Sequence, residues 1–257
     1  REEISGLQRG VLALCLTAGL LCGCGGGSNA VTGSPSSPAT SAQSSDSAAD
    51  QSMAEKTVGR LSDLTSRWQV LLPRDDPIVA AEMACVRSVG RGGLTAEHAG
   101  DLFSSGDPTV LVGGKPFSHL PKVVTSSVWV YDTREDAASA FTAAEGFVRS
   151  RSAAQCLMRA MQTSNGPRVL SARGFVLRPG GLPAGNDRVS GTNWQVRLPG
   201  KVTVFVDTVL ILQERGVGEA VLSSVSVPPF YGPLTSDDVR YWSGVVADRI
   251  AHGWRPA

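Results

Sequence analysis

Four β-rich segments follow one another in the second half of the chain, with only short connections between them. They span Arg168–Leu177, Arg188–Leu198, Lys201–Gln213 and Glu219–Val227. Parallel neighbours need crossovers of a dozen residues or more, whereas Pro199-Gly200 and Arg215-Gly216-Val217-Gly218 are short and contain glycine. The connections therefore predict antiparallel hairpins, with turns at these two places.

Side-chain alternation shows which faces of these strands are buried. Trp194, Val196 and Leu198 alternate with Gln195 and Arg197, which is typical of a strand with one face in the core. The segment from 202 to 212 is almost wholly apolar, as expected for a central strand covered on both sides. An earlier segment, Val123–Tyr131, is rich in Val, Thr, Trp and Tyr and predicts a further strand.

Apolar residues at helical spacing predict helices around this sheet. One helix is expected over Thr57–Leu72, ended by Pro73. A second is expected around Cys85 and Val86, and Thr95 is the expected cap of a short third one ending near Phe103.

Two later helices have clearer start signals. Thr133 with Asp136 predicts a capped start, and Thr235–Asp238 predicts the start of a closing helix that ends at Gly253. Trp129, Trp194 and Trp242 are expected in the core, because each lies on a predicted strand or apolar helix stripe. The fold class is therefore α+β, with a central antiparallel sheet of about five strands backed by helices in one domain over residues 53–257.

The N-terminal segment differs in kind from the rest. The apolar run Val11–Leu21 is too short to span a membrane but has the length of a signal-peptide core. Leu21-Cys22-Gly23-Cys24, directly after it, resembles the bacterial lipobox, which implies a signal peptide over residues 1–23 and lipidation of Cys24. The residues before the run are not net positive, because Arg1 and Arg9 stand against Glu2 and Glu3. A short buried helix is the alternative.

Residues 24–52 consist mainly of Gly, Ser, Ala, Thr and Pro. Such a segment buries too little apolar surface to offset its ordering entropy, so a flexible tether is expected. Signal run, lipobox and tether in this order predict a lipid-anchored extracytoplasmic protein at the cell membrane.

Cys85 and Cys156 are the two cysteines of the predicted domain. In an exported domain they most simply form a disulfide. A metal site is not expected, because His98, His119 and His252 show no ligand spacing. A nucleophilic cysteine with a histidine partner stays open as the weaker alternative.

Other signatures of chemistry are missing. The formal net charge of +1 argues against a nucleic-acid partner, and no G-x-S-x-G elbow is present. Gly113-Gly114-Lys115 is followed by Pro116 and indicates a turn. The pairs Asp75-Asp76 and Asp237-Asp238 lie at element boundaries and are expected to cap helices. The sequence predicts neither an enzyme nor a cofactor.

The order of these parts resembles actinobacterial envelope lipoproteins with an extracellular sensor-type domain. It is similar to the periplasmic sensor domain of a mycobacterial receptor serine/threonine kinase, over roughly Leu61 to Trp254. The resemblance implies a central antiparallel sheet, flanking helices and a cleft, in a sensing or binding role. That kinase domain is held by two disulfides, whereas this domain has cysteines for one.

Three functions follow as hypotheses. The favoured one is a non-catalytic envelope lipoprotein that binds a small or lipidic ligand, or a cell-wall fragment, in a cleft between sheet and helices. The alternative is an interaction module that docks on an envelope membrane protein through an exposed apolar patch. The third is an envelope hydrolase, which requires a histidine or a carboxylate pair converging in a pocket. The sequence does not identify ligand-binding residues.

Overall fold

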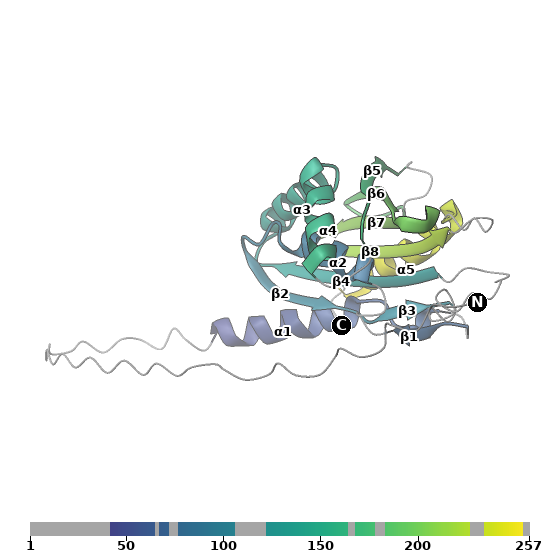
Figure 1. The fold of residues 1–257 in the computed structure, drawn as a ribbon. Coiled ribbons are helices and arrows are strands. Elements are labelled where there is room, and N and C mark those ends of the chain that lie inside the picture. Colours follow the sequence, from purple (N-terminus) through teal and green to yellow (C-terminus); the bar gives the residue numbers. More distant parts are fainter. Residues whose placement is uncertain are drawn as a thin grey trace, which may run out of the picture. The chain divides into compact units, whose positions relative to one another are not determined.

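The computed structural model describes residues 42–64, 67–71, 77–105, 122–163, 168–177, 183–226 and 234–253. Cys24, Asp75-Asp76, Gly113–Lys115 and His119 lie outside the described residues, as does the predicted signal peptide. The described part is an α+β fold built on one open antiparallel sheet (Figure 1). No helix in the described ranges is long and apolar enough to cross a membrane.

The sheet has eight strands in the described chain, where about five were expected. Its order is β1-β3-β4-β8-β7-β6-β5, and β2 pairs with β4 beside β3. The strands are β1 Gln69–Leu71, β2 Leu94–Ala99, β3 Leu102–Ser104, β4 Lys122–Tyr131, β5 Ser171–Val176, β6 Arg188–Arg197, β7 Thr203–Gln213 and β8 Gly216–Ser226. The expected count was low because β1, β2 and β3 are short and were assigned to helices.

Helices cover both faces of the sheet. They are α1 Ala42–Thr57, α2 Pro77–Arg87, α3 Arg134–Val148, α4 Arg151–Thr163 and α5 Ser236–Gly253. Side chains of α1 and α5 pack with Val128, Ile211 and Leu222 on one face. Side chains of α2, α3 and α4 pack on the other face, in two clusters that include Trp194 and Trp129.

The alternation of the strands explains this two-sided core. Along β7, Val204 and Val206 belong to the cluster with α2 and α4, whereas Val209 and Ile211 belong to the cluster with α1 and α5. A strand whose side chains are needed on both faces has an apolar residue at nearly every position, as predicted for this segment. Trp129, Trp194 and Trp242 are all buried, as expected.

The predicted helix over Thr57–Leu72 is wrong. The chain leaves α1 after Thr57, and Gln69–Leu71 is a strand paired with β3. Gly59 explains the break: its amide donates to Ser126 Oγ at 2.8 Å, and a Cβ there would lie 2.4 Å from Trp242. Contacts with β4 and α5 therefore outweigh the helical spacing, although Val58, Leu64 and Trp68 still pack in the core.

Helix α1 begins at Ala42, so residues 42–52 of the segment predicted as tether are helical. The helix is held by tertiary contacts: Ala54 is fully buried, and α1 packs on β2, β4 and α5. Such contacts compensate for a composition that favours a helix only weakly.

The short helix expected from Thr95 to Phe103 is also wrong, because these residues form β2 and β3. The Thr95 hydroxyl donates to Asp50 Oδ2 at 2.6 Å instead of capping a helix. The expected turn at Gly216–Gly218 is wrong as well, since the β7–β8 turn is Glu214-Arg215 and the glycines lie in β8. A Cβ on Gly218 would lie 2.0 Å from Ile250 Cδ1, so this glycine allows α5 to pack closely.

The two capped helix starts are confirmed. Asp136 N donates to Thr133 Oγ1 at 3.0 Å at the start of α3. At α5, Asp238 N donates to Thr235 Oγ1 at 3.2 Å, and Thr235 N donates to Asp238 Oδ2 at 2.9 Å. Cys85 on α2 and Cys156 on α4 form the expected disulfide, with Cα atoms 6.0 Å apart.

Candidate functional site

A cleft lies where the N-terminal end of α5 meets the sheet surface of β5, β6 and β7. Its volume is about 330 Å³, within the range of small-molecule sites. Apolar and polar side chains line it in equal number. The lining residues are Val176, Leu177, Asn193, Gln195, Phe205, Asp207, Leu234, Thr235, Ser236 and Val239.

Strand alternation places the polar groups on this surface. Asn193 and Asp207 are direct partners in the β6–β7 pairing, so their side chains lie side by side on one face. Asn193 Nδ2 donates to Asp207 Oδ1 at 2.6 Å. Asp207 is only 2% exposed, although it belongs to the lining of an open cleft.

Burial controls the titration of Asp207. Loss of hydration raises the pKa of its carboxyl to about 6, against the hydrogen bond from Asn193, and the nearby Asp238 adds to the rise. Burial also opposes ionisation of Asp238, but hydrogen bonds from Lys122 and Thr235 outweigh it and lower the Asp238 pKa. Lys122 Nζ lies 2.6 Å from Asp238 Oδ1. A buried carboxyl with a perturbed pKa in a cleft is a typical feature of a functional site.

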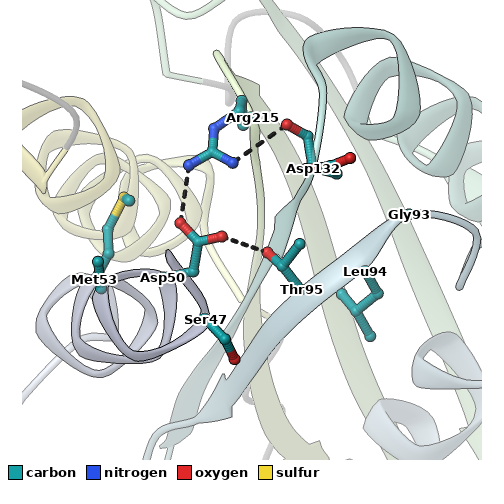
Figure 2. A pocket seen from close by; sticks show the side chains of 9 residues that line it. Ser47, Asp50, Met53, Gly93, Leu94, Thr95, Asp132 and Arg215 are labelled. Atoms are coloured by element: carbon teal, nitrogen blue, oxygen red, sulfur yellow. Dashed lines mark hydrogen bonds and ion pairs between the residues drawn. The ribbon is translucent and has the colours of Figure 1, made fainter. Parts of the chain in front are cut away.

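A second hollow, of about 610 Å³, lies between α1, β2 and the β7–β8 turn. Figure 2 shows its charged groups directed at one another. Asp50 accepts from Arg215 Nη2 at 2.8 Å and from the Thr95 hydroxyl at 2.6 Å. Arg215 Nη1 donates to the carbonyl oxygens of Tyr131 and Asp132. These contacts fasten α1 to the sheet, so the hollow is better explained as a structural junction than as a ligand site.

A third hollow, of about 570 Å³, lies between the loop before β6 and the outer face of α5. Its ionisable lining residues, Arg240 and Asp248, are both exposed. Nothing in this lining has the buried polar character of Asp207.

Two buried glutamates lie between α2 and the opposite face of the sheet, Glu82 on α2 and Glu219 on β8. Glu82 Oε1 accepts from the Thr208 hydroxyl at 2.5 Å, and Glu219 Oε2 accepts from the Ser127 hydroxyl at 2.7 Å. Glu82 Oε2 and Glu219 Oε1 have no hydrogen-bond partner in the described part of the chain. Burial raises the pKa of Glu82 to about 7 and that of Glu219 well above its usual value, where the Glu82 charge adds to the rise.

The expected residues of a hydrolase are not brought together in the described ranges. His98 lies on β2 and His252 in the last turn of α5. Cys85 and Cys156 are in the disulfide, so neither is a free thiol. In the described ranges no three His, Cys, Asp or Glu side chains are grouped to hold a metal ion.

Sequence reasoning missed Asp207 and the two glutamates. A signal was present, because Asp207 is the acidic residue inside the apolar segment from 202 to 212. A charged residue on a central strand is buried only where it has a partner or a role. The hydrogen-bond partner of Asp207 lies on β6 and α5 borders the same cleft, and the alignment of these two elements with β7 cannot be obtained from spacing alone.

The solved structures to which this chain is similar include a mycobacterial extracellular domain. The extracellular domain of PknH from Mycobacterium tuberculosis superposes with a TM-score of 0.38 and 10% sequence identity, over 79% of this chain and 96% of that one. A similarity at this level does not establish a common function. No family model matches the sequence, and no curated protein matches it.

Proposed function

We propose that this chain is a lipid-anchored, extracytoplasmic binding protein that holds a small amphipathic ligand in the cleft beside Asp207. The observation that carries the proposal is the cleft itself, in which a nearly buried carboxyl lies with apolar side chains on both sides of the cleft. A non-catalytic role is part of the proposal. The one hydroxyl–carboxylate contact at the described cleft is that of Thr235 with Asp238, at 2.8 Å, and it belongs to the cap of α5.

The extracytoplasmic part rests on the cysteines. The disulfide between α2 and α4 fits an oxidising compartment. The lipobox-like residues around Cys24 and the tether that follows would hold such a domain at a membrane surface.

Native mass spectrometry of the full chain, extracted from the envelope of the producing cell, tests the binding. We expect a native mass above the denatured mass, and loss of this excess in Val239→Trp, which fills the cleft. Gly244→Trp is the matched control: it places the same side chain on α5 where no atom lies within 4 Å of a Cβ. A bare mass for the unmodified chain would contradict the proposal.

Cell fractionation tests the anchor. We expect the unmodified chain in the membrane fraction and Cys24→Ser in the soluble extracytoplasmic fraction. Cys22→Ser is the control and should remain with the membrane, because the proposed acylation is at Cys24. Equal membrane association of both variants would contradict lipidation of Cys24.

A docking module is the second candidate. Phe175 is 47% and Val176 62% exposed on β5, which is the last strand in the sheet order. Exposed apolar side chains on an edge strand favour a protein contact. Copurification of an envelope protein that is lost in Val176→Lys would support this candidate over the binding protein.

A further inference from the structure

The charge of the cleft defines what it can accept. Among its described lining residues, Asp207 is the one ionisable side chain. The charge of the adjacent Asp238 is matched by Lys122. The cleft therefore carries one uncompensated negative charge whenever Asp207 is ionised, and this charge disfavours an anionic ligand.

The hydrogen bonding of Asp207 is incomplete. Asn193 donates to Oδ1, and no other hydrogen bond to the carboxyl exists among the described residues. An ionised carboxylate accepts at both oxygens, and a nearly buried one is stabilised by a donor that also carries positive charge. Gln195 lies on the same face of β6 and offers a second acceptor beside it.

Apolar side chains lie on both sides of the cleft. Phe205 and Leu177 line it from the sheet side, Val239 lines it from α5, and Leu234 lines it just before α5. They would bury a hydrocarbon group but offer no charge.

Building on the proposed binding function, we propose that the ligand is an organic ammonium: a protonated amine that bonds to Asp207 and carries an apolar group packed against Phe205. The ammonium supplies both the missing donors and the missing positive charge. A neutral hydroxyl would supply only a donor, and a carboxylate would add a second negative charge.

Three probes of equal chain length separate these chemistries. The full chain carrying Cys24→Ser, which needs no detergent, is titrated at pH 7.5 with n-octylammonium, n-octanol and n-octanoate. The NMR signals of the Asn193 side-chain amide report binding at the cleft. We expect n-octylammonium to bind about tenfold more tightly than n-octanol, as for a charge-assisted hydrogen bond, and n-octanoate to bind most weakly.

Two variants and a change of pH test whether the preference for n-octylammonium depends on Asp207. Asp207→Asn should bind n-octylammonium and n-octanol about equally. Asp237→Asn is the control, since Asp237 lies in the first turn of α5, beside the cleft, with its side chain 89% exposed, and it should keep the preference. In the unmodified cleft the preference should weaken from pH 7.5 to pH 5, because protonation of Asp207 removes the charge; Asp238 stays ionised beside Lys122.

The outcomes are separable. Equal binding of n-octanol and n-octylammonium, tighter n-octanoate, or a preference that survives both Asp207→Asn and pH 5 would overturn the ammonium assignment while leaving a binding cleft. Failure of all three probes to shift the Asn193 signals would overturn the assignment and count against the proposed function as well.

Discussion

Single residues decide where the elements of this protein approach one another. Gly218 is the clearest case, because the absence of a Cβ leaves the space occupied by Ile250 Cδ1. The sequence suggested a turn at this glycine, since a Gly-Val-Gly stretch between two β-rich segments is typical of one. The actual reason is a contact with a helix about thirty residues later, which no local pattern reveals.

Gly218→Ala should therefore destabilise the protein, by about 1–3 kcal/mol, because the new methyl group overlaps Ile250. Urea unfolding followed by circular dichroism measures the change. Adding Ile250→Val removes Cδ1 and should recover part of the loss. As a control, Gly244→Ala on α5 meets no atom within 4 Å and should be neutral or slightly stabilising. Equal effects of the two alanines would contradict the contact.

At the scale of helices and strands, local spacing predicted the helix starts but not the conformation of the segment from 57 to 72. The helix starts at Thr133 and Thr235 were predictable, because capping depends on residues three positions apart. The conformation of the segment from 57 to 72 was not, because it depends on Gly59 meeting Ser126 and Trp242. The apolar positions of this segment were predicted correctly, but long-range contacts determine its backbone conformation.

The tie between α1 and the sheet should control local opening of that helix. In Asp50→Asn, Arg215 loses its ion-pair partner. Hydrogen exchange should then become faster in α1 by the equivalent of about 1–3 kcal/mol, with β7 and β8 unchanged. Glu55→Gln, on the exposed side of the same helix, is the control and should leave exchange as it was. A uniform change across α1 and the sheet would speak against local opening.

The disulfide ties α2 to α4 across a sequence separation of 71 residues. Closing a loop of this length restricts the unfolded chain, so removing the bond should lower the free energy of unfolding by about 4 kcal/mol. Denaturant unfolding of Cys85→Ser with Cys156→Ser measures this loss. Reduction of the unmodified protein should give a similar value. An unchanged midpoint in both would show that the bond contributes little.

At the scale of the whole molecule, buried carboxyl groups lie on both faces of the sheet: Glu82 and Glu219 between α2 and the sheet, and Asp207 in the cleft beside α5. The sequence predicted the α+β class and most long strands, since these follow from local alternation. It did not reveal Glu82, Glu219 or Asp207 as buried, because each is covered by an element distant in sequence. A cleft between sheet and helices was expected from the resemblance, but the residues that line it were not predicted.

The buried glutamates predict a pH dependence of global stability. Both have pKa values raised above that of an unfolded glutamate, so the folded state holds more protons. Their contribution is fully present below about pH 4.5. For Glu82 it is lost as the pH rises through about 7, by up to about 1.4 kcal/mol per pH unit for the proton released, and Glu219, whose pKa is raised in the same direction, adds to the decline. Urea unfolding at intervals from pH 5 to pH 8 measures the decline.

Glu82→Gln should flatten that decline, because the amide cannot ionise and keeps an acceptor for the Thr208 hydroxyl. Glu97→Gln is the control, since Glu97 pairs with Arg91 at an exposed position, and it should leave the slope unchanged. Parallel curves for Glu82→Gln and the unmodified protein would contradict the role of this carboxyl.

The position of α1 would have a mechanical consequence under the proposed anchoring at Cys24. Any pull along the predicted tether reaches α1 before any other described element, because α1 begins at Ala42. The load then passes to the Asp50–Arg215 ion pair, and through Arg215 to the β7–β8 turn. Tension would thus detach α1 ahead of the strands. The cleft, which lies on β5, β6 and β7 at the other end of the strand order, would keep its shape while the segment between anchor and sheet becomes longer.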